Sequence, residues 1–532
     1  MIEEINIRNV RLFDGPDEWR IPIAPLSVFC GTNSAGKSTI LKSLLLLCQS
    51  NAETDVGKRE GRLRFAGTLV DLGSYQSFVS HNRIDQDIEI GVTIRNSIES
   101  RYLRRLQKGR DEASRELSGS FSQIRQEYVL SSRFYCGVRK AEQQSDEEII
   151  GVATAQETSH AGQAFLKEAS FHFHTETNID LVWKIVLNES SNDYAALIPL
   201  DYFGKSGGFT MMDVPKDVIE GYVKIDAFIR GLLPIGVWAQ AKSRKTKDAD
   251  KPKDWSFFPL PPLIRDCSNQ LRLELERIHY LGPLRSAAKR YYMTNLDVLP
   301  AMDAAGEFLP YVLRDQRNEN VTYVPPGRGA GVAEKPLKYA LDSWMYYLRT
   351  GRYLEDEQGE DLHEIDVTSM KEVLLEFTLK SFGGEAHALA DSGFGYSQLL
   401  PIVVRGLIAE VTSTIIIEQP ELHLNPALQV RLSEFLASLT LAGKCVLIET
   451  HSEHIVNAIR VLTAEDPTKS LAKKCRIFFL DTESGMPRIK QLEIQSDGTV
   501  PEWPRQFFGD ALSLSARLLR AQDKLEKDPK ID

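Results

Sequence analysis

An eight-residue segment near the N-terminus constrains the fold of this chain more than any other feature. Residues 31–38 read Gly-Thr-Asn-Ser-Ala-Gly-Lys-Ser and fit the pattern GxxxxGK[ST] completely. A short apolar run, Leu26–Cys30, precedes the segment, and the almost wholly apolar Thr39–Gln49 follows it. A strand, a glycine-containing loop and a buried helix in this order are typical of a phosphate-binding loop. We therefore expect an α/β core that binds a nucleotide.

Each residue type in this loop has a physical reason. Glycines let the backbone approach a phosphate closely, so that successive N–H groups point at it. Lys37 brings a positive charge to the terminal phosphates, the Ser38 hydroxyl can bind Mg²⁺, and the N-terminus of the next helix adds a positive field. We predict that ATP is bound by the following residues: Gly31, Asn33, Ser34, Gly36, Lys37, Ser38 and Thr39.

Three later segments have the short, β-branched runs that are typical of buried parallel strands. They are Thr414–Ile417, Lys444–Ile448 and Arg476–Leu480, and the helical stretches Ala427–Leu439 and Glu453–Leu462 separate them. Strands and helices that alternate after a phosphate-binding loop predict an α/β ATPase core.

The first of these strands ends in a carboxylate, Glu418. A buried carboxylate costs free energy unless a cation faces it, and a Mg²⁺ ion held by Ser38 would compensate. We therefore predict that Ser38 and Glu418 are the Mg²⁺ ligands.

Four segments together resemble the ABC-type ATPase heads of the RecF, SMC and OLD proteins: GTNSAGKST, DSGFGYSQLLP, IIIEQPELHLNP and IETHSEH. The resemblance implies an α/β, ABC-type P-loop ATPase head that forms a homodimer or a higher oligomer. It makes His451 the switch histidine. It also implies a signature loop that acts in trans on the γ-phosphate bound by a second subunit. This loop departs from the usual LSGGQ, and its candidate residues are Ser392, Gly393, Gly395, Ser397 and Gln398.

The residue after Glu418 departs from the ABC pattern, which has a glutamate there to polarise the attacking water. This chain has Gln419, and an amide can orient water but cannot accept a proton at neutral pH. Two alternatives follow. Either hydrolysis is slow and ATP mainly holds a dimer together, or Glu421 and His451 orient the water.

A narrower resemblance is carried by His279–Arg285 (HYLGPLR), GFGYSQLLP, EQPELHLNP and a C-terminal segment from Asp497 to Asp510. These segments resemble ATPases of anti-phage defence operons, among them PtuA of the Septu system and the ATPase found with some retrons. The resemblance implies a switch that controls a separate effector, such as a small HNH nuclease of the PtuB kind, alone or with a reverse transcriptase and its DNA. The alternatives are an OLD-type nuclease in its own right and a RecF-like repair ATPase that binds duplex DNA.

Several side chains leave more than one role open. Arg285 could sense the γ-phosphate or form a structural salt bridge. Asp481 and Glu483 resemble the acidic pair of a TOPRIM nuclease, but the following Gly485 favours a hairpin turn. His172 and His174 share one face of a strand-like run, where surface histidines are favoured over a metal pair.

The pattern along the chain predicts four parts. Residues 1–97 and 276–495 form the ATPase head, 98–275 an inserted α+β or helical domain, and 496–532 a short extension. Within the insert we expect a helix over Ser114–Val129 and a strand over Ala169–His174. The proline-rich Phe258–Leu263 is expected to lead back to the head.

Composition narrows the class of protein. The net charge of −10 argues against a dedicated nucleic-acid coat, although local basic stretches leave nucleic-acid binding open. Six scattered cysteines without a CxxC pair argue against a disulfide framework. There is no basic-then-apolar leader and no run of 18 apolar residues, so we expect a cytoplasmic protein without a membrane anchor.

Overall fold

The structure is a computed structural model of the 532-residue chain. It describes residues 1–52, 61–98, 124–136, 163–175, 180–188, 193–200, 218–240, 255–260, 262–293, 304–307, 309–327, 329, 331–354, 365–370, 374–380, 386–391, 394–483 and 485–504. The chain divides into two compact units. Unit 1 consists of residues 1–23 and 39–278, and unit 2 of residues 24–38 and 279–532.

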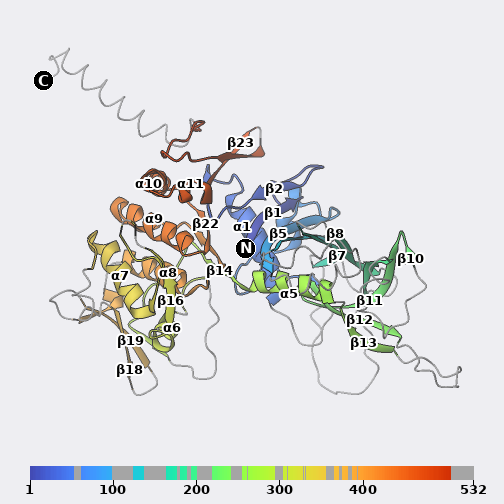
Figure 1. The fold of residues 1–532 in the computed structure, drawn as a ribbon, viewed down its shortest axis with the longest axis horizontal. Helices are drawn as coiled ribbons and strands as arrows, with labels where there is room; N and C mark the ends of the chain where they lie inside the picture. Colours follow the sequence, from blue (N-terminus) through green and yellow to red (C-terminus); the bar gives the residue numbers. More distant parts are fainter. Residues whose placement is uncertain are drawn as a thin grey trace, which may run out of the picture. The chain divides into compact units, whose positions relative to one another are not determined.

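Unit 1 is built on an antiparallel sheet (Figure 1). Within the described residues its strands are β1 (Ile2–Arg8), β2 (Trp19–Pro22), β4 (Arg62–Leu63), β5 (Ile88–Ile98), β6 (Ile124–Cys136), β7 (Ala164–Thr175), β8 (Asp180–Asn188), β9 (Asp193–Pro199), β10 (Val218–Ile219), β11 (Tyr222–Arg230), β12 (Leu233–Gln240) and β13 (Trp255–Pro259). Its helical segments are α1 (Lys37–Ala52), which begins in unit 2, α2 (Tyr75–Phe78), η1 (Ser80–Asn82) and α5 (Pro262–Glu276).

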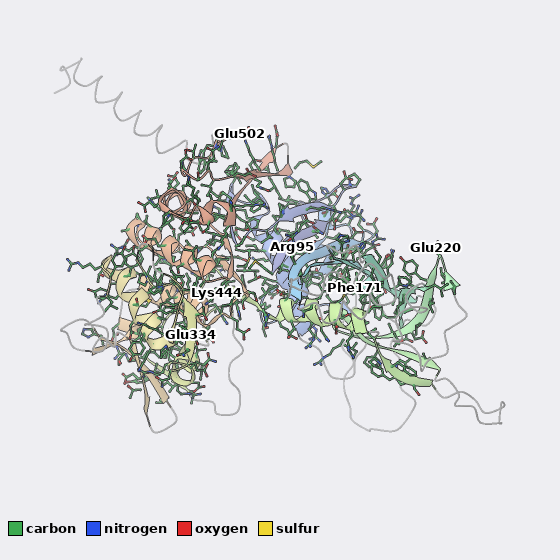
Figure 2. The ribbon with its side chains drawn as sticks, viewed as in Figure 1. Arg95, Phe171, Glu220, Glu334, Lys444 and Glu502 are labelled. Carbon is green, nitrogen blue, oxygen red and sulfur yellow. The ribbon has the colours of Figure 1, made fainter. Side chains whose placement is uncertain are left out.

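The sheet of unit 1 corrects part of the predicted insert. Residues 124–129 open β6, which pairs with β5 and β7, so a helix over Ser114–Val129 is wrong there, and residues 114–123 lie outside the described part. The strand over Ala169–His174 is confirmed within β7. Its alternation buries Phe171 (labelled in Figure 2), which stacks on Trp183, and leaves His172 and His174 exposed.

The proline-rich segment lies inside unit 1. Pro259 is the last residue of β13, and Pro262 is the first residue of α5, where its missing N–H costs no helical hydrogen bond. Phe258–Leu263 therefore joins β13 to α5, and the next strand after α5 belongs to the sheet that carries the phosphate-binding loop, so its role as a linker to the head stays a prediction.

Unit 2 contains the sheet that carries the phosphate-binding loop. Its strand order is β14 (Ile278–Leu281), β21 (Thr414–Glu418), β22 (Cys445–Glu449), β3 (Leu26–Gly31), β23 (Cys475–Glu483) and β24 (Met486–Leu492). Neighbouring strands from β21 to β23 run parallel, and β24 is antiparallel to β23. The three strands predicted from β-branched runs are thus confirmed as β21, β22 and β23. β22 and β23 flank β3, and β21 lies beyond β22, so the carboxyl ends of four parallel strands meet at one edge of the sheet.

Helices cover this sheet. They are α6 (Leu309–Asp315), α7 (Leu337–Thr350), α8 (Phe394–Ile408), α9 (Pro426–Leu441), α10 (Glu453–Glu465) and α11 (Ser470–Lys474), with the short η3 (Leu389–Asp391). Two small sheets complete unit 2. One contains β15 (Tyr291–Met293), β18 (Ile365–Met370), β19 (Leu374–Lys380) and β20 (Ala386–Ala388), and the other β16 (Asn320–Tyr323) and β17 (Ala333–Pro336). The core is continuous from the central strands to α7, α8 and α9, which pack against one another (Figure 1).

One lysine is wholly buried in this core. Lys444, labelled in Figure 2, donates hydrogen bonds from Nζ to the carbonyl oxygens of Gly406 (2.7 Å) and Leu407 (2.9 Å) at the C-terminal end of α8. Carbonyls at a helix C-terminus attract a cation. Burial nevertheless lowers the pKa of Lys444 to about 7.

This lowered pKa predicts a pH-dependent stability. Between pH 7 and the ordinary lysine pKa, the unfolded chain binds a proton that the folded chain does not, so the free energy of unfolding rises with pH. A Lys444→Met variant lacks this contribution. We expect the free energy of unfolding of wild type to rise relative to that of Lys444→Met by about 1.4 kcal/mol per pH unit over this range. Chemical denaturation of both proteins at neutral and at mildly alkaline pH measures the shift, and a constant difference would contradict it.

Candidate functional site

The loop predicted to bind phosphate has a curled backbone that depends on its glycines. Gly31, Ser34 and Gly36 all have positive φ angles, of 130°, 60° and 97°. A Cβ atom on Gly31 would lie 1.9 Å from the carbonyl oxygen of Leu480 in β23, so only glycine fits there. Asn33 and Ser34 are exposed at the tip of the loop. Alternation of right- and left-handed residues lines up N–H groups into an anion-binding concavity.

Lys37 is the first residue of α1 and is almost wholly buried. Its Nζ atom donates to the carbonyl oxygens of Gly31 (3.2 Å) and Thr32 (2.7 Å), which places the ammonium inside the curl of the loop. Burial lowers the pKa of Lys37, and the nearby Glu449 carboxylate opposes that shift. Thr39, the last predicted nucleotide ligand, is buried and belongs to unit 1.

The Ser38 hydroxyl donates a 2.7 Å hydrogen bond to Oε1 of Glu449, the last residue of β22. The predicted partner, Glu418, ends the next strand, β21, and its Oε1 accepts a 3.0 Å hydrogen bond from the Tyr280 hydroxyl. Both carboxylates are almost wholly buried, at 4% and 3% exposure. The Mg²⁺ role of Ser38 and Glu418 stays a prediction, and the structure adds Glu449 beside it.

Sequence reasoning missed Glu449 and Tyr280. A signal for Glu449 was present, because it ends its apolar strand as Glu418 ends the neighbouring one. What the sequence lacks is the strand order, which puts β22 between β21 and β3 and so brings Glu449 nearer the loop. Tyr280 lies in the quoted HYLGPLR segment, whose pairing as β14 beside β21 no local pattern predicts.

Arg285 is a second buried cation of the site, with 5% exposure. Its Nη2 donates to the main-chain oxygen of Glu418 (3.0 Å), whereas Nε and Nη1 have no hydrogen-bond partner among the described residues. Burial lowers the pKa of Arg285 to about 10, opposed by the charge of Glu421. A buried guanidinium with unused N–H groups can donate hydrogen bonds to a phosphate oxygen.

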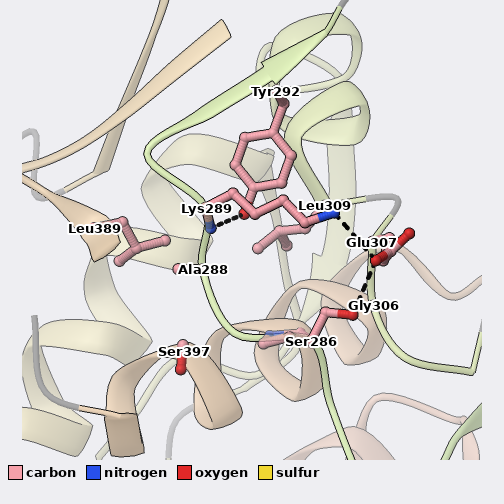
Figure 3. Close-up of a pocket in the computed structure, with 10 residues that line it drawn as sticks. Ser286, Ala288, Lys289, Tyr292, Gly306, Glu307, Leu309, Leu389 and Ser397 are labelled. Carbon is pink, nitrogen blue, oxygen red and sulfur yellow. Dashed lines mark hydrogen bonds and ion pairs between the residues drawn. The ribbon is translucent and has the colours of Figure 1, made fainter. Parts of the chain in front are cut away.

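The loop that follows Arg285 is braced by side chains around a small cavity of about 20 Å³ (Figure 3). Glu307 accepts hydrogen bonds from the Ser286 hydroxyl (3.2 Å) and from Lys289 Nζ (3.3 Å). The Tyr292 hydroxyl accepts a hydrogen bond from the Lys289 main-chain N–H (2.8 Å). These contacts hold the chain just beyond the guanidinium, and the cavity has room for about one water molecule.

Gln419 occupies a left-handed backbone conformation, with φ of 44°, directly after β21. Its main-chain N–H donates to the carbonyl oxygen of Glu449 (2.7 Å), which fixes this turn against the neighbouring strand. For a residue other than glycine this conformation is uncommon, and such residues cluster at functional sites.

Glu421 turns toward the segment that follows β22. Its Oε2 accepts from the Thr450 hydroxyl (2.8 Å), and its Oε1 accepts from the main-chain N–H of His451 (2.7 Å). Burial raises the pKa of Glu421, and the hydrogen bond from His451 opposes the shift. Burial and the charge of Lys37 lower the pKa of His451, so its imidazole is neutral at neutral pH. Glu421 is thus bonded to the main chain of His451, and the water-orienting role of the two residues stays a prediction.

The signature-loop residues differ in where they lie. Ser392 and Gly393 are outside the described residues, and Gly395 lies in the first turn of α8. Ser397 and Gln398 are buried, and Gln398 Nε2 donates to the carbonyl oxygen of Arg285 (3.1 Å). Gln398 therefore positions Arg285 within its own subunit. The trans-acting role of the loop stays a prediction.

A larger cavity, of about 590 Å³, opens beside the first turn of α8. Its lining contains Gly395, His423 and two arginines, Arg349 and Arg431, and no carboxylate lines it among the residues that the structure describes. Its apolar wall comes from Met345, Leu348, Leu399, Ala427 and Leu428. The cavity therefore suits an anionic group.

Asp481 and Glu483 lie in a hairpin. β23 and β24 pair antiparallel with Asp481 opposite Arg488, and Glu483 forms a 2.9 Å ion pair with Arg488. The hairpin predicted from the turn residues is confirmed, and Glu483 is neutralised by a cation across it. Within the described residues no group of three or more His, Cys, Asp or Glu side chains is placed to hold a metal ion.

Comparison with models of protein families shows to which family this chain belongs. The model of the family described as AAA ATPase domain matches residues 1–194 and 347–456, more than half of the chain. The chain belongs to this family. As an AAA ATPase it binds and hydrolyses ATP, and it has the α/β P-loop fold with its domain split by an insertion, residues 195–346. Residues 98–194, which the sequence pattern placed in the insert, fall inside the family's domain.

Solved structures similar to this AAA ATPase include three SMC heads. An SMC head bound to the C-terminal winged-helix domain of ScpA has a TM-score of 0.36 and 10% identity, covering 93% of this chain and 98% of its own. The SMC head domain from Thermotoga maritima has a TM-score of 0.35 and 8% identity, covering 93% and 99%. An SMC head with an extended coiled coil, bound to the C-terminal domain of ScpA derived from Pyrococcus furiosus, has a TM-score of 0.34 and 10% identity, covering 92% and 96%. No curated protein matches the AAA ATPase. Among the described residues, none of its helices has the length and apolar character needed to cross a membrane.

Proposed function

We propose that this AAA ATPase is a nucleotide-gated switch, in which two subunits close on bound ATP and a slow hydrolysis step ends the closed state. The proposal rests on the identity of the residue after Glu418. Gln419 has a neutral amide where a proton acceptor would speed hydrolysis, and both oxygens of Glu421 already accept hydrogen bonds. A slow chemical step prolongs the ATP-bound state.

The residues present fit a magnesium–ATP complex. The loop from Gly31 to Ser38 would hold the phosphates through its N–H groups and Lys37, while Ser38 with the carboxylate of Glu418 would face the cation. Bound Mg²⁺ would neutralise the charge that develops on the phosphates. Arg285, with two unused donor atoms, would contact the γ-phosphate in cis, and the Gln419 amide would orient the water without accepting its proton.

Closure between two copies is supported by the surface near α8. The carboxylate-free cavity lined by Gly395, His423, Arg349 and Arg431 is suited to the phosphates of a nucleotide presented by a second subunit. We propose a homodimer on this basis, with the first turn of α8, which contains Gly395, at its contact surface.

The effector is proposed from the sequence resemblance. The HYLGPLR, GFGYSQLLP and EQPELHLNP segments favour an ATPase of the anti-phage defence kind, which would hold or release a separate nuclease such as a PtuB-like HNH protein, or a reverse transcriptase with its DNA. The ion pair of Glu483 with Arg488 favours this arrangement over a nuclease site at the β23–β24 hairpin.

One set of assays separates the alternatives. Purified protein is incubated with plasmid, Mg²⁺ or Mn²⁺ and ATP, and its mass in solution is measured with and without ATP. A switch with a separate effector is expected to double its mass with ATP and leave the plasmid intact and unbound. Cleavage would point to a nuclease of the OLD type, and ATP-dependent retention of uncut duplex would point to a repair ATPase.

A further inference from the structure

Two buried carboxylates face the same side of the central sheet. Glu418 and Glu449 are register partners in the parallel pair β21–β22, so their side chains project from the same face. Neighbouring strands lie about 4.8 Å apart, which brings the two acids close together in a poorly solvated place. Two like charges held in this way repel each other unless a cation lies between or beside them.

The two protein cations nearby donate hydrogen bonds to main-chain carbonyl oxygens. The ammonium of Lys37 donates to two loop carbonyls, and the guanidinium of Arg285 donates to the main-chain oxygen of Glu418. Glu449 accepts a hydrogen bond from the Ser38 hydroxyl through Oε1, but its Oε2 is buried and has no hydrogen-bond partner among the described residues. A buried carboxylate oxygen in this state has a preference for a cation.

We propose that Glu449 is a ligand of the nucleotide-associated Mg²⁺, together with Ser38, and that Glu418 acts from the adjoining strand as the second carboxylate of the same cation site. Hard oxygen donors of this kind, a hydroxyl and carboxylates beside phosphate oxygens, are the ligands that Mg²⁺ prefers. The strand order makes Glu449 the nearer acid, because β22 separates β21 from β3. This inference rests on the proposed function, since the cation arrives with ATP.

The test measures how much Mg²⁺ strengthens nucleotide binding. Equilibrium dialysis of full-length protein with ATPγS, in EDTA and in Mg²⁺, gives two dissociation constants. The constant in EDTA divided by the constant in Mg²⁺ measures how much Mg²⁺ strengthens binding. For Glu449→Gln we expect this ratio to fall at least about tenfold, while the dissociation constant in EDTA stays near wild type, because the amide can still accept the Ser38 hydrogen bond. Glu453→Gln, a partly exposed acid in the first turn of α10, should keep the wild-type ratio.

The outcomes are distinct. A wild-type ratio in Glu449→Gln overturns the inference, and so does a larger ratio, which would mean that Glu449 blocks Ser38. If Glu449→Gln binds no nucleotide in EDTA, the same ratio is measured for Glu449→Asp, which keeps a carboxylate on a shorter side chain. A reduced ratio with intact binding in EDTA supports the inference, and an unchanged ratio opposes it. If wild-type protein binds no ATPγS in either buffer, the proposed function itself fails.

Discussion

Replacing Lys37 with alanine is expected to weaken ATP binding by about a hundredfold or more. The ammonium is the positive charge inside the curl of the phosphate-binding loop, where it is almost wholly buried and bonded to the carbonyl oxygens of Gly31 and Thr32. A charge-assisted hydrogen bond in such a place contributes about 3 kcal/mol, and each 1.4 kcal/mol is a factor of ten in affinity. Equilibrium dialysis with Mg²⁺ and ATP measures the loss.

The matched control is Lys42→Ala, which removes the same side chain further along α1. We expect Lys42→Ala to bind ATP like wild type. If Lys37→Ala binds ATP as wild type does and still changes its oligomeric state with ATP, the loop is not the nucleotide site.

Gln419→Glu is expected to raise the steady-state rate of ATP hydrolysis by about a hundredfold. General bases contribute about 10²–10⁴ in rate, and glutamate has the length of glutamine with an oxygen that can accept a proton. The left-handed backbone at this position suits both residues equally, so the substitution adds no new backbone strain. Turnover is measured with a coupled phosphate-release assay on both proteins.

Glu421→Gln tests the competing explanation. Its carboxylate accepts from both Thr450 and the His451 main-chain N–H, and an amide can accept only through its single oxygen. If Glu421 only braces His451, turnover should fall a few fold. Wild-type turnover above about 10 s⁻¹, or a loss of turnover in Glu421→Gln with no gain in Gln419→Glu, would show that Glu421 and His451 already activate the water.

The central sheet was predictable because its strands carry their signal locally. β21 and β22 are short β-branched runs in which every residue is buried, and β23 is buried from Ile477 to Leu480, so apolar side chains suit both faces of these strands. The loop between β3 and α1 was also predictable, since its chemistry demands glycine, lysine and serine at fixed spacing.

Features that depend on pairing between distant strands could not be predicted in the same way. The Ser38–Glu449 hydrogen bond joins residues 411 positions apart, and it follows from the strand order alone. Residues 124–129 read as a helix, but pairing with β5 and β7 holds them in a strand, because tertiary contacts override local preference. The burial of Gln398 against the Arg285 carbonyl likewise depends on the packing of α8.

The position of Gly31 has a consequence for how the protein is made. Its backbone is pressed against Leu480, and β3 is flanked on both sides by strands that come from beyond residue 440. During synthesis the nucleotide loop emerges long before its two lateral supports, β22 and β23. The nascent chain therefore cannot form a competent ATP site until both strands have been translated, and its apolar β3 stays uncovered until then.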